Sequence, residues 1–342
     1  MKKLFMRWEW LLVLMIAAVY LFFHFMMPQT YTLKNLLGQT RVYMVDVGFL
    51  ALGAMLILIL GDIDISVAST AGLSVTIMAV TYNAGDGIPF WVSMMLALVI
   101  GAVCGALNGL LITRFKELFA MIITLSTMTL YRGIAYIILK DQSAGGFPAW
   151  FTKDLGYGTI GATPIPIMLL FILAMFPLFH VLLHKTASGR RLFATGANIS
   201  TARYSGVRTD RMKLIIFIIN GVLAAVCGIF LSARTGSVKY TIATGFEMQA
   251  IAIAVLGGAS PNGGKGSVPG VFLSLVLMTF LKNGLTLLFN DQFILNLSVG
   301  ALLIGVVLVP NMIATLRERE AVARRRRETQ IESGGAINTP LK

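Results

Sequence analysis

Residues 91–113 of the chain read WVSMMLALVIGAVCGALNGLLIT and contain no charged side chain. An α-helix crosses the roughly 30 Å core of a bilayer with about 20 apolar residues, so this stretch predicts a membrane-spanning helix. Gly101, Gly105 and Gly109 recur at every fourth position, a spacing that lets helix backbones approach closely within a membrane. The stretch therefore predicts an integral membrane protein in which helices pack through small residues.

The composition of all 342 residues supports the same conclusion. Apolar residues make up 57% of the chain and charged residues only 13%, and the mean hydropathy is +0.82. A soluble domain has about 45–50% apolar and about 25% charged residues, and a disordered chain has fewer apolar residues still. The formal net charge is +13. In a membrane protein such an excess is expected in the cytoplasmic loops that orient the helices, so no nucleic-acid partner is predicted and the lipid membrane is the expected surrounding.

The same length criterion predicts a series of spans along the chain. A shorter apolar piece at 246–258 is either a short span or part of a broken helix. The remaining predicted spans are 10–27, 43–61, 64–82, 91–113, 119–139, 164–183, 213–233, 268–289 and 293–313.

The distribution of basic residues favours ten spans over nine. With a cytoplasmic N-terminus, ten spans place the loop 184–213 and the basic run Arg324–Arg327 in the cytoplasm, where positive charge accumulates. Nine spans would place that basic run outside. We therefore predict an all-α, polytopic membrane protein with about ten transmembrane helices and both termini in the cytoplasm. It would have one transmembrane domain over 1–316, with a cytoplasmic loop at 184–213, and a basic cytoplasmic tail over 317–342.

The sequence offers no recognisable catalytic or metal-binding set. Cys104 and Cys227 lie inside apolar runs without a nearby cysteine partner, and the three histidines are scattered, which argues against disulfides and metal sites. The glycine-rich segment 256–267 differs from a phosphate-binding loop, because Ala259 replaces its first glycine and Gly266 replaces its Ser or Thr. We predict no cofactor and no enzymatic activity in this chain.

Two aspartates interrupt the apolar sequence at Asp62-Ile63-Asp64-Ile65-Ser66. Charged groups within a membrane are costly unless they meet water, a helix terminus or a partner. The favoured interpretation is that they cap the N-terminus of the third span together with Ser66. A role in a transport path or a partner contact is the alternative. Four further ionisable residues lie within apolar runs and are candidates for substrate contact or for buried pairing: Asp46, Arg132, Glu247 and Lys282.

The loop 184–213 is the longest and most basic of the predicted cytoplasmic loops. Asn198 or Ser200 is a suitable N-cap for a short helix, and Gly206 is suited to end it. Such a basic helix either rests on anionic lipid or docks a soluble partner.

Four blocks of the chain, spread in order over about 45–310, resemble the membrane permease subunits of bacterial sugar-uptake ABC transporters. The group includes permeases for ribose, xylose, arabinose, rhamnose and the furanosyl autoinducer. The family usually has Gly-Gly-Ile-Asp-Leu-Ser-Val-Gly-Ser in its first block, where this chain has Asp62 in place of the second glycine and Ala68 in place of the later one. The blocks are 62–69, 123–133, 189–206 and 247–266.

The resemblance implies an ATP-driven importer in the bacterial inner membrane. Two permease subunits, the second being a copy or a paralogue, would form the pathway. Two ABC ATPase subunits would drive it, and an extracytoplasmic sugar-binding protein would deliver a pentose, a deoxyhexose such as rhamnose, or a furanosyl autoinducer. We predict that the segment 196–206 lies in a groove of the ATPase. The residues expected to take part in this coupling are Gly189, Arg190, Gly196, Asn198, Ala202, Arg203 and Gly206.

Two alternatives remain open from the sequence. A self-sufficient secondary transporter could use Asp46, Asp62, Asp64 and Glu247 to carry coupling ions. The second alternative is an ABC permease that transports amino acids or nucleosides.

Overall fold

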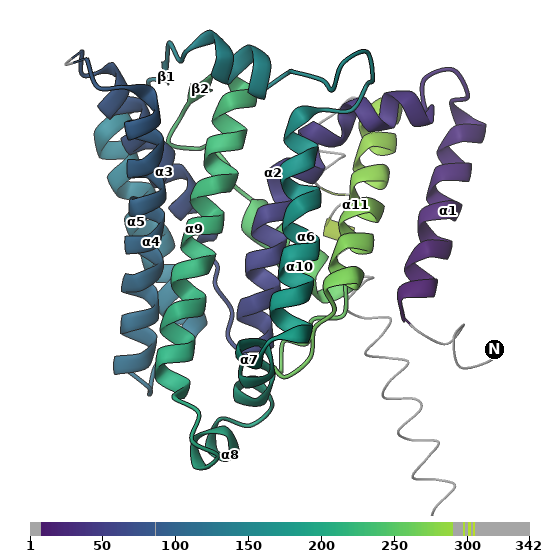
Figure 1. Ribbon diagram of the computed structural model, residues 1–342. Coiled ribbons are helices and arrows are strands. Elements are labelled where there is room, and N and C mark those ends of the chain that lie inside the picture. The colour runs from purple at the N-terminus through teal and green to yellow at the C-terminus, as the bar shows by residue number, and fades with distance from the viewer. Residues whose placement is uncertain (1–7, 86, 290–296, 298–299, 302–303, 305–342) are drawn as a thin grey trace, which may run out of the picture. The chain divides into compact units, whose positions relative to one another are not determined.

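The computed structural model describes residues 8–85, 87–289, 297, 300–301 and 304, and it is mostly helical (Figure 1). The chain divides into two compact units, 1–290 and 291–342, and the arrangement below concerns the first. In chain order its helices are α1 (Trp8–Met26), α2 (Leu33–Ile59), α3 (Val67–Asn83), α4 (Phe90–Arg114), α5 (Ala120–Leu139), α6 (Ile167–Lys185), α7 (Ala187–Ala197), α8 (Ile199–Tyr204), α9 (Thr209–Thr235), α10 (Phe246–Leu256) and α11 (Val268–Phe289).

The described helices follow the predicted apolar runs. Six of them are long and apolar enough to cross a membrane, and α2 would make a seventh if its two bent parts form one span. Helix α3 has 17 residues and α10 has 11. The predicted span 293–313 falls almost entirely outside the described residues, as do the boundary at 316 and the tail. The count of ten spans therefore stays a prediction.

The structure differs from the prediction at the start of one helix. Helix α2 begins at Leu33, ten residues before the predicted start at 43, because Thr32 caps it by accepting a hydrogen bond from Asn35 N (3.3 Å). It then bends by 55° between Thr40 and Tyr43. Helix α10, in contrast, lies within the predicted short piece 246–258. It is about 16 Å long at 1.5 Å per residue, which is too short to cross a bilayer core by itself.

The predicted packing through glycines is confirmed between α4 and α9. A Cβ atom added at Gly101 would lie 2.5 Å from the carbonyl oxygen of Gly221, and one added at Gly105 would lie 2.2 Å from that of Phe217. Both distances are far below van der Waals contact. The two backbones touch because residues at these positions have no side chain.

The two ends of the first unit differ in structure (Figure 1). At one end lie α7 and α8, near the last turn of α6 and the first turn of α9. The opposite end has a small antiparallel pair, β1 (Ala144–Gly145) with β2 (Ser237–Val238), and a short π-helix, η1 (Trp150–Leu155). This strand pair is the only sheet among the described residues, and it departs from a strictly all-α prediction.

Candidate functional site

Helix α7 turns sharply away from the end of α6. Its N-cap is Thr186, whose Oγ1 accepts a hydrogen bond from Gly189 N at 3.3 Å. A Cβ atom at position 189 would lie 1.9 Å from the carbonyl oxygen of Leu183, so only glycine permits the turn. The side chain of Arg190 is exposed. Of these two predicted coupling residues, Gly189 therefore shapes the turn and Arg190 faces outward.

Helix α8 begins and ends at the predicted residues. The Oδ1 atom of Asn198 accepts a hydrogen bond from Thr201 N (2.9 Å), and Gly206 ends the helix with a φ of 84°. Ser200, the alternative cap, lies inside the helix. The loop thus contains two helices where the sequence predicted one.

One face of α8 is fixed to the protein and the other is open. Ala202 is buried, and Arg203 Nη2 lies 3.1 Å from Oδ1 of Asp210 at the start of α9. Lys116, in the loop between α4 and α5, reaches the second oxygen of Asp210 at 2.9 Å. The side chain of Tyr204 is 94% exposed. The sequence prediction did not single out this aromatic residue.

Four glycines join α7 to the ends of two other segments. We call Gly61, Gly196, Gly263 and Gly264 the glycine junction. The amide of Gly264 donates a hydrogen bond to the carbonyl oxygen of Ile59 at 2.8 Å. A Cβ atom at Gly196 would lie 1.7 Å from that same oxygen, and one at Gly263 would lie 2.4 Å from the oxygen of Gly196. Helix α7, the end of α2 and the loop between α10 and α11 therefore meet backbone to backbone.

A polar cluster is buried among the helices next to this junction. It consists of Asp64, Ser66, Asn108, Tyr131 and Asn220, each at most 5% exposed. Asp64 accepts hydrogen bonds from the amide and hydroxyl of Ser66 (2.8 and 2.7 Å) and from Asn220 Nδ2 (2.8 Å). Asn108 Nδ2 donates to Ser66 Oγ at 2.7 Å, and the Tyr131 hydroxyl donates to Asn108 Oδ1 at 3.2 Å. The cluster thereby joins the α2–α3 loop to α4, α5 and α9.

The predicted capping role of these acidic residues was wrong in part. Ser66 is the N-cap residue of α3, but its side chain makes no capping hydrogen bond. Asp64 instead accepts hydrogen bonds from Ser66 and Asn220, as described above. Asp62 forms an ion pair with Lys213, the fifth residue of α9, with a nitrogen–oxygen distance of 2.7 Å. The aspartate that departs from the family pattern therefore has a basic partner in this chain.

Arg132 and Glu247 hold one loop at the opposite end. Arg132 Nη1 donates hydrogen bonds to the carbonyl oxygens of Tyr240 (2.5 Å) and Ile242 (2.8 Å). Glu247 Oε2 accepts one from Gly245 N at 3.1 Å. Both residues thus fix the segment that leads into α10.

Asp46 and Lys282 lie near each other between α2 and α11. Asp46 is fully buried, and its carboxylate forms an ion pair with Arg234 Nη2 at 2.6 Å. The ammonium of Lys282 lies over the ring of Tyr43, 4.4 Å from its centroid. Of the two interpretations for intramembrane charges, buried pairing holds for Asp46.

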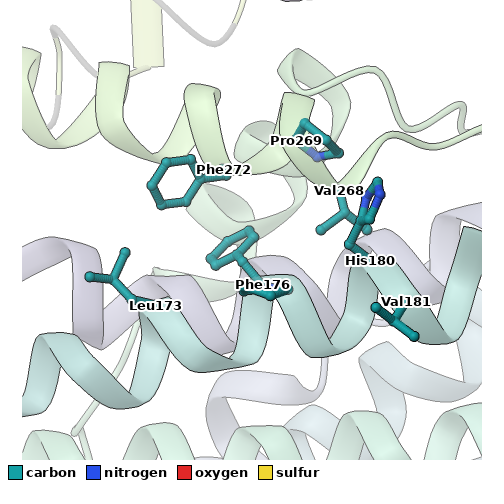
Figure 2. A pocket seen from close by; sticks show the side chains of 8 residues that line it. Leu173, Phe176, His180, Val181, Val268, Pro269 and Phe272 are labelled. Atoms are coloured by element: carbon teal, nitrogen blue, oxygen red, sulfur yellow. The ribbon is translucent and has the colours of Figure 1, made fainter.

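A cavity of about 460 Å³ lies between α6 and α11, with side chains of both helices around it (Figure 2). Apart from His180, its lining is apolar, so it offers few partners to a hydroxyl-rich molecule. The lining residues are Leu173, Phe176, Pro177, His180, Val181, Val268, Pro269 and Phe272.

Comparison with known proteins places the sequence of this chain in a family. Residues 36–310 match the family described as the permease component of branched-chain amino acid transport systems. The autoinducer 2 import system permease protein LsrC of Photorhabdus luminescens is 36% identical over 260 residues, 76% of each chain. The corresponding LsrD protein of Yersinia pseudotuberculosis is 33% identical over 306 residues, 88% of this chain and 90% of its own. The LsrD protein of Klebsiella pneumoniae is 33% identical over 312 residues, 90% of this chain and 92% of its own. No solved structure matches the chain.

The match covers most of the described helices, including α7, α8 and the glycine junction. The predicted resemblance is confirmed by these comparisons. The chain therefore belongs to the family of ABC-transporter permease subunits that includes the autoinducer 2 import permeases.

Proposed function

We propose that this chain is the permease subunit of an ATP-driven importer for a monosaccharide or a furanosyl autoinducer. A second permease, as a copy or a paralogue, would complete the pathway, and two ABC ATPase subunits would supply the energy. An extracytoplasmic binding protein would deliver the cargo. The chain would lie in the bacterial inner membrane, with its α7–α8 end facing the cytoplasm. The observation that carries the proposal is the α7–α8 segment, which has an open outer face and is fixed to the helices behind it.

The glycine junction supports a coupling role for this segment. Gly196 of α7 touches the last carbonyl of α2 and the loop before α11 without any intervening side chain. Packed backbones transmit displacement because they have no free space in which to absorb it. A movement imposed on α8 by an ATPase would thus reach α2 and α11 directly.

Replacement of Tyr204 by alanine is expected to weaken the ATPase contact. Exposed aromatic residues that become buried in a complex are frequent hot spots of binding energy, and a loss of about 2 kcal/mol lowers affinity about thirtyfold. The measurement is co-purification of the ATPase together with ATP hydrolysis stimulated by the loaded binding protein.

Ser205→Ala is the matched control for this variant. Ser205 is the next residue, and its Oγ donates a hydrogen bond only within α8, to Thr201 O at 3.0 Å. It should leave ATPase binding and stimulated hydrolysis within about twofold of the parent. Equal behaviour of both variants would remove Tyr204 from the proposed contact.

The cargo is proposed from two sources. The relatives LsrC and LsrD are permeases of autoinducer 2 import systems, and the blocks quoted above resemble sugar permeases. We would identify the binding protein by co-purification and measure its thermal unfolding with ribose, rhamnose, autoinducer 2 and leucine. A shift with one of the first three compounds is expected.

An amino-acid permease is the second candidate function, because the matching family is described by branched-chain amino acid transport. A shift of the binding protein with leucine alone would favour it and overturn the sugar proposal. Ion-coupled transport has less support. Asp46 and Asp62, two of the carboxylates considered for ion coupling, form ion pairs with Arg234 and Lys213.

A further inference from the structure

A second cavity, of about 130 Å³, lies between α2 and α11 and differs in character from the apolar one. Six of its seven lining residues are polar: Gln39, Tyr43, Thr279, Lys282, Asn283 and Thr286, with Leu287 as the seventh. The glycine junction contacts the end of α2 and the loop that precedes α11. The polar cavity is lined by the first turns of α2 and the last turns of α11, and therefore lies toward the end opposite to α7 and α8.

Several polar groups around this cavity have no protein partner. The buried hydroxyl of Tyr43 makes no hydrogen bond within the described part of the chain. Within that same part, the side-chain amides of Gln39, which is exposed, and of Asn283, which is half-buried, make no hydrogen bond either and are free to bind a ligand. The ammonium of Lys282 contacts the face of the Tyr43 ring. A buried polar group without a partner, here the Tyr43 hydroxyl, is costly, and such groups in native proteins commonly bind a ligand or water.

The chemistry of these groups indicates the class of ligand. Each amide offers both donors and an acceptor, the tyrosine hydroxyl can do either, and the ammonium offers three donors. An anion only accepts hydrogen bonds, whereas a molecule rich in hydroxyl groups both donates and accepts. The neighbouring Asp46 also offsets the positive charge of Arg234 through their ion pair. The set therefore suits an uncharged, hydroxyl-rich molecule better than an anion.

We propose that Gln39, Tyr43, Lys282 and Asn283 form a subsite on the transport path for part of an uncharged molecule of monosaccharide size. Polar side chains within membrane helices commonly line substrate pathways, and this group lies at the end where a binding protein would release its cargo. This inference rests on the proposed importer function. It adds to that function the residues that would contact the substrate.

Tyr43→Phe tests the subsite without disturbing the protein. The variant removes one hydroxyl that has no partner in the described structure, so the fold should be as stable as before or slightly more stable. The complex would be reconstituted with its ATPase, second permease and binding protein. Uptake of isotope-labelled autoinducer 2 and ribose, together with ATP hydrolysis, would be measured at saturating loaded binding protein. We expect the amount transported per ATP hydrolysed to fall about threefold to tenfold, the usual effect of one lost hydrogen bond.

Tyr31→Phe is the matched control. The hydroxyl of Tyr31 donates a hydrogen bond to the carbonyl oxygen of Phe280 in α11 at 2.7 Å, so its removal should lower thermal stability and leave the transport ratio unchanged. An unchanged ratio in Tyr43→Phe, with normal uptake by the parent, would overturn the subsite and leave the importer function standing. Failure of the parent complex to take up either probe would instead overturn the sugar-import proposal, and the subsite with it.

Discussion

Gly196→Ala is expected to abolish coupled transport and to lower the stability of the protein. The added Cβ would lie 1.7 Å from the carbonyl oxygen of Ile59 and 2.8 Å from the amide of Gly264. Both neighbours are backbone atoms, and they form a hydrogen bond with each other. Neither can therefore move without breaking that hydrogen bond. We expect the α7–α8 segment to detach from α2, with a loss of about 3 kcal/mol or more in unfolding free energy. Thermal unfolding in detergent and ATP-driven uptake are the measurements.

Gly133→Ala provides a control of opposite sign. Gly133 is also helical, in α5, and a Cβ atom there meets nothing within 4 Å. Since alanine is favoured over glycine in a helix by up to about 1 kcal/mol, this variant should be as stable as the parent or more stable, with normal uptake. If the two variants behaved alike, backbone contact at the glycine junction would not be the reason that position 196 requires glycine.

Asp64→Leu is expected to have the second large effect. The carboxylate accepts three buried hydrogen bonds, two from Ser66 and one from Asn220. Leucine is close to aspartate in shape but accepts none, and each buried donor left unpaired costs about 1–3 kcal/mol. We expect a loss of at least about 3 kcal/mol, seen as reduced accumulation in the membrane and a lower unfolding temperature.

Asp64→Asn separates hydrogen bonding from charge at this position. Asparagine keeps an acceptor for Ser66, and Asn220, whose own Oδ1 is buried without a partner among the described residues, can rotate its amide to accept from the new side chain. We expect Asp64→Asn to retain most of the stability that Asp64→Leu loses. Equal losses in the two variants would show that the negative charge, not the hydrogen bonds, holds the α2–α3 loop.

Much of the helical framework could be predicted from local sequence. Long uncharged runs determine where the helices form, as in α4, and the glycines at every fourth position mark the face on which that helix packs closely. The partner of this face, α9, lies more than about 100 positions further along the chain and has no such local signal. The caps of α8 are equally local, because Asn198 and Gly206 act on residues within three or four positions. The early start of α2 was missed because residues 33–42 are less apolar than the run that follows them.

The candidate site could be predicted only in part, because its contacts join distant segments. The glycine junction brings together residues near 60, 196 and 263, and no local pattern shows that these glycines meet. Asp64 was recognised as unusual, but its partner Asn220 lies 156 positions further along the chain. A polar asparagine within each of two apolar runs, at 108 and 220, was the available signal for the buried cluster.

The central claim is that this chain transports its cargo only when coupled to a separate ATPase. The most direct measurement compares two kinds of proteoliposome, one with this chain alone and one with the whole complex. Uptake of labelled autoinducer 2 and ribose would be followed with ATP on the α7–α8 side and, separately, with a proton or sodium gradient. We predict uptake only by the complete complex, only with hydrolysable ATP, and none by the chain alone under either gradient. Uptake by the chain alone under an ion gradient would contradict the account.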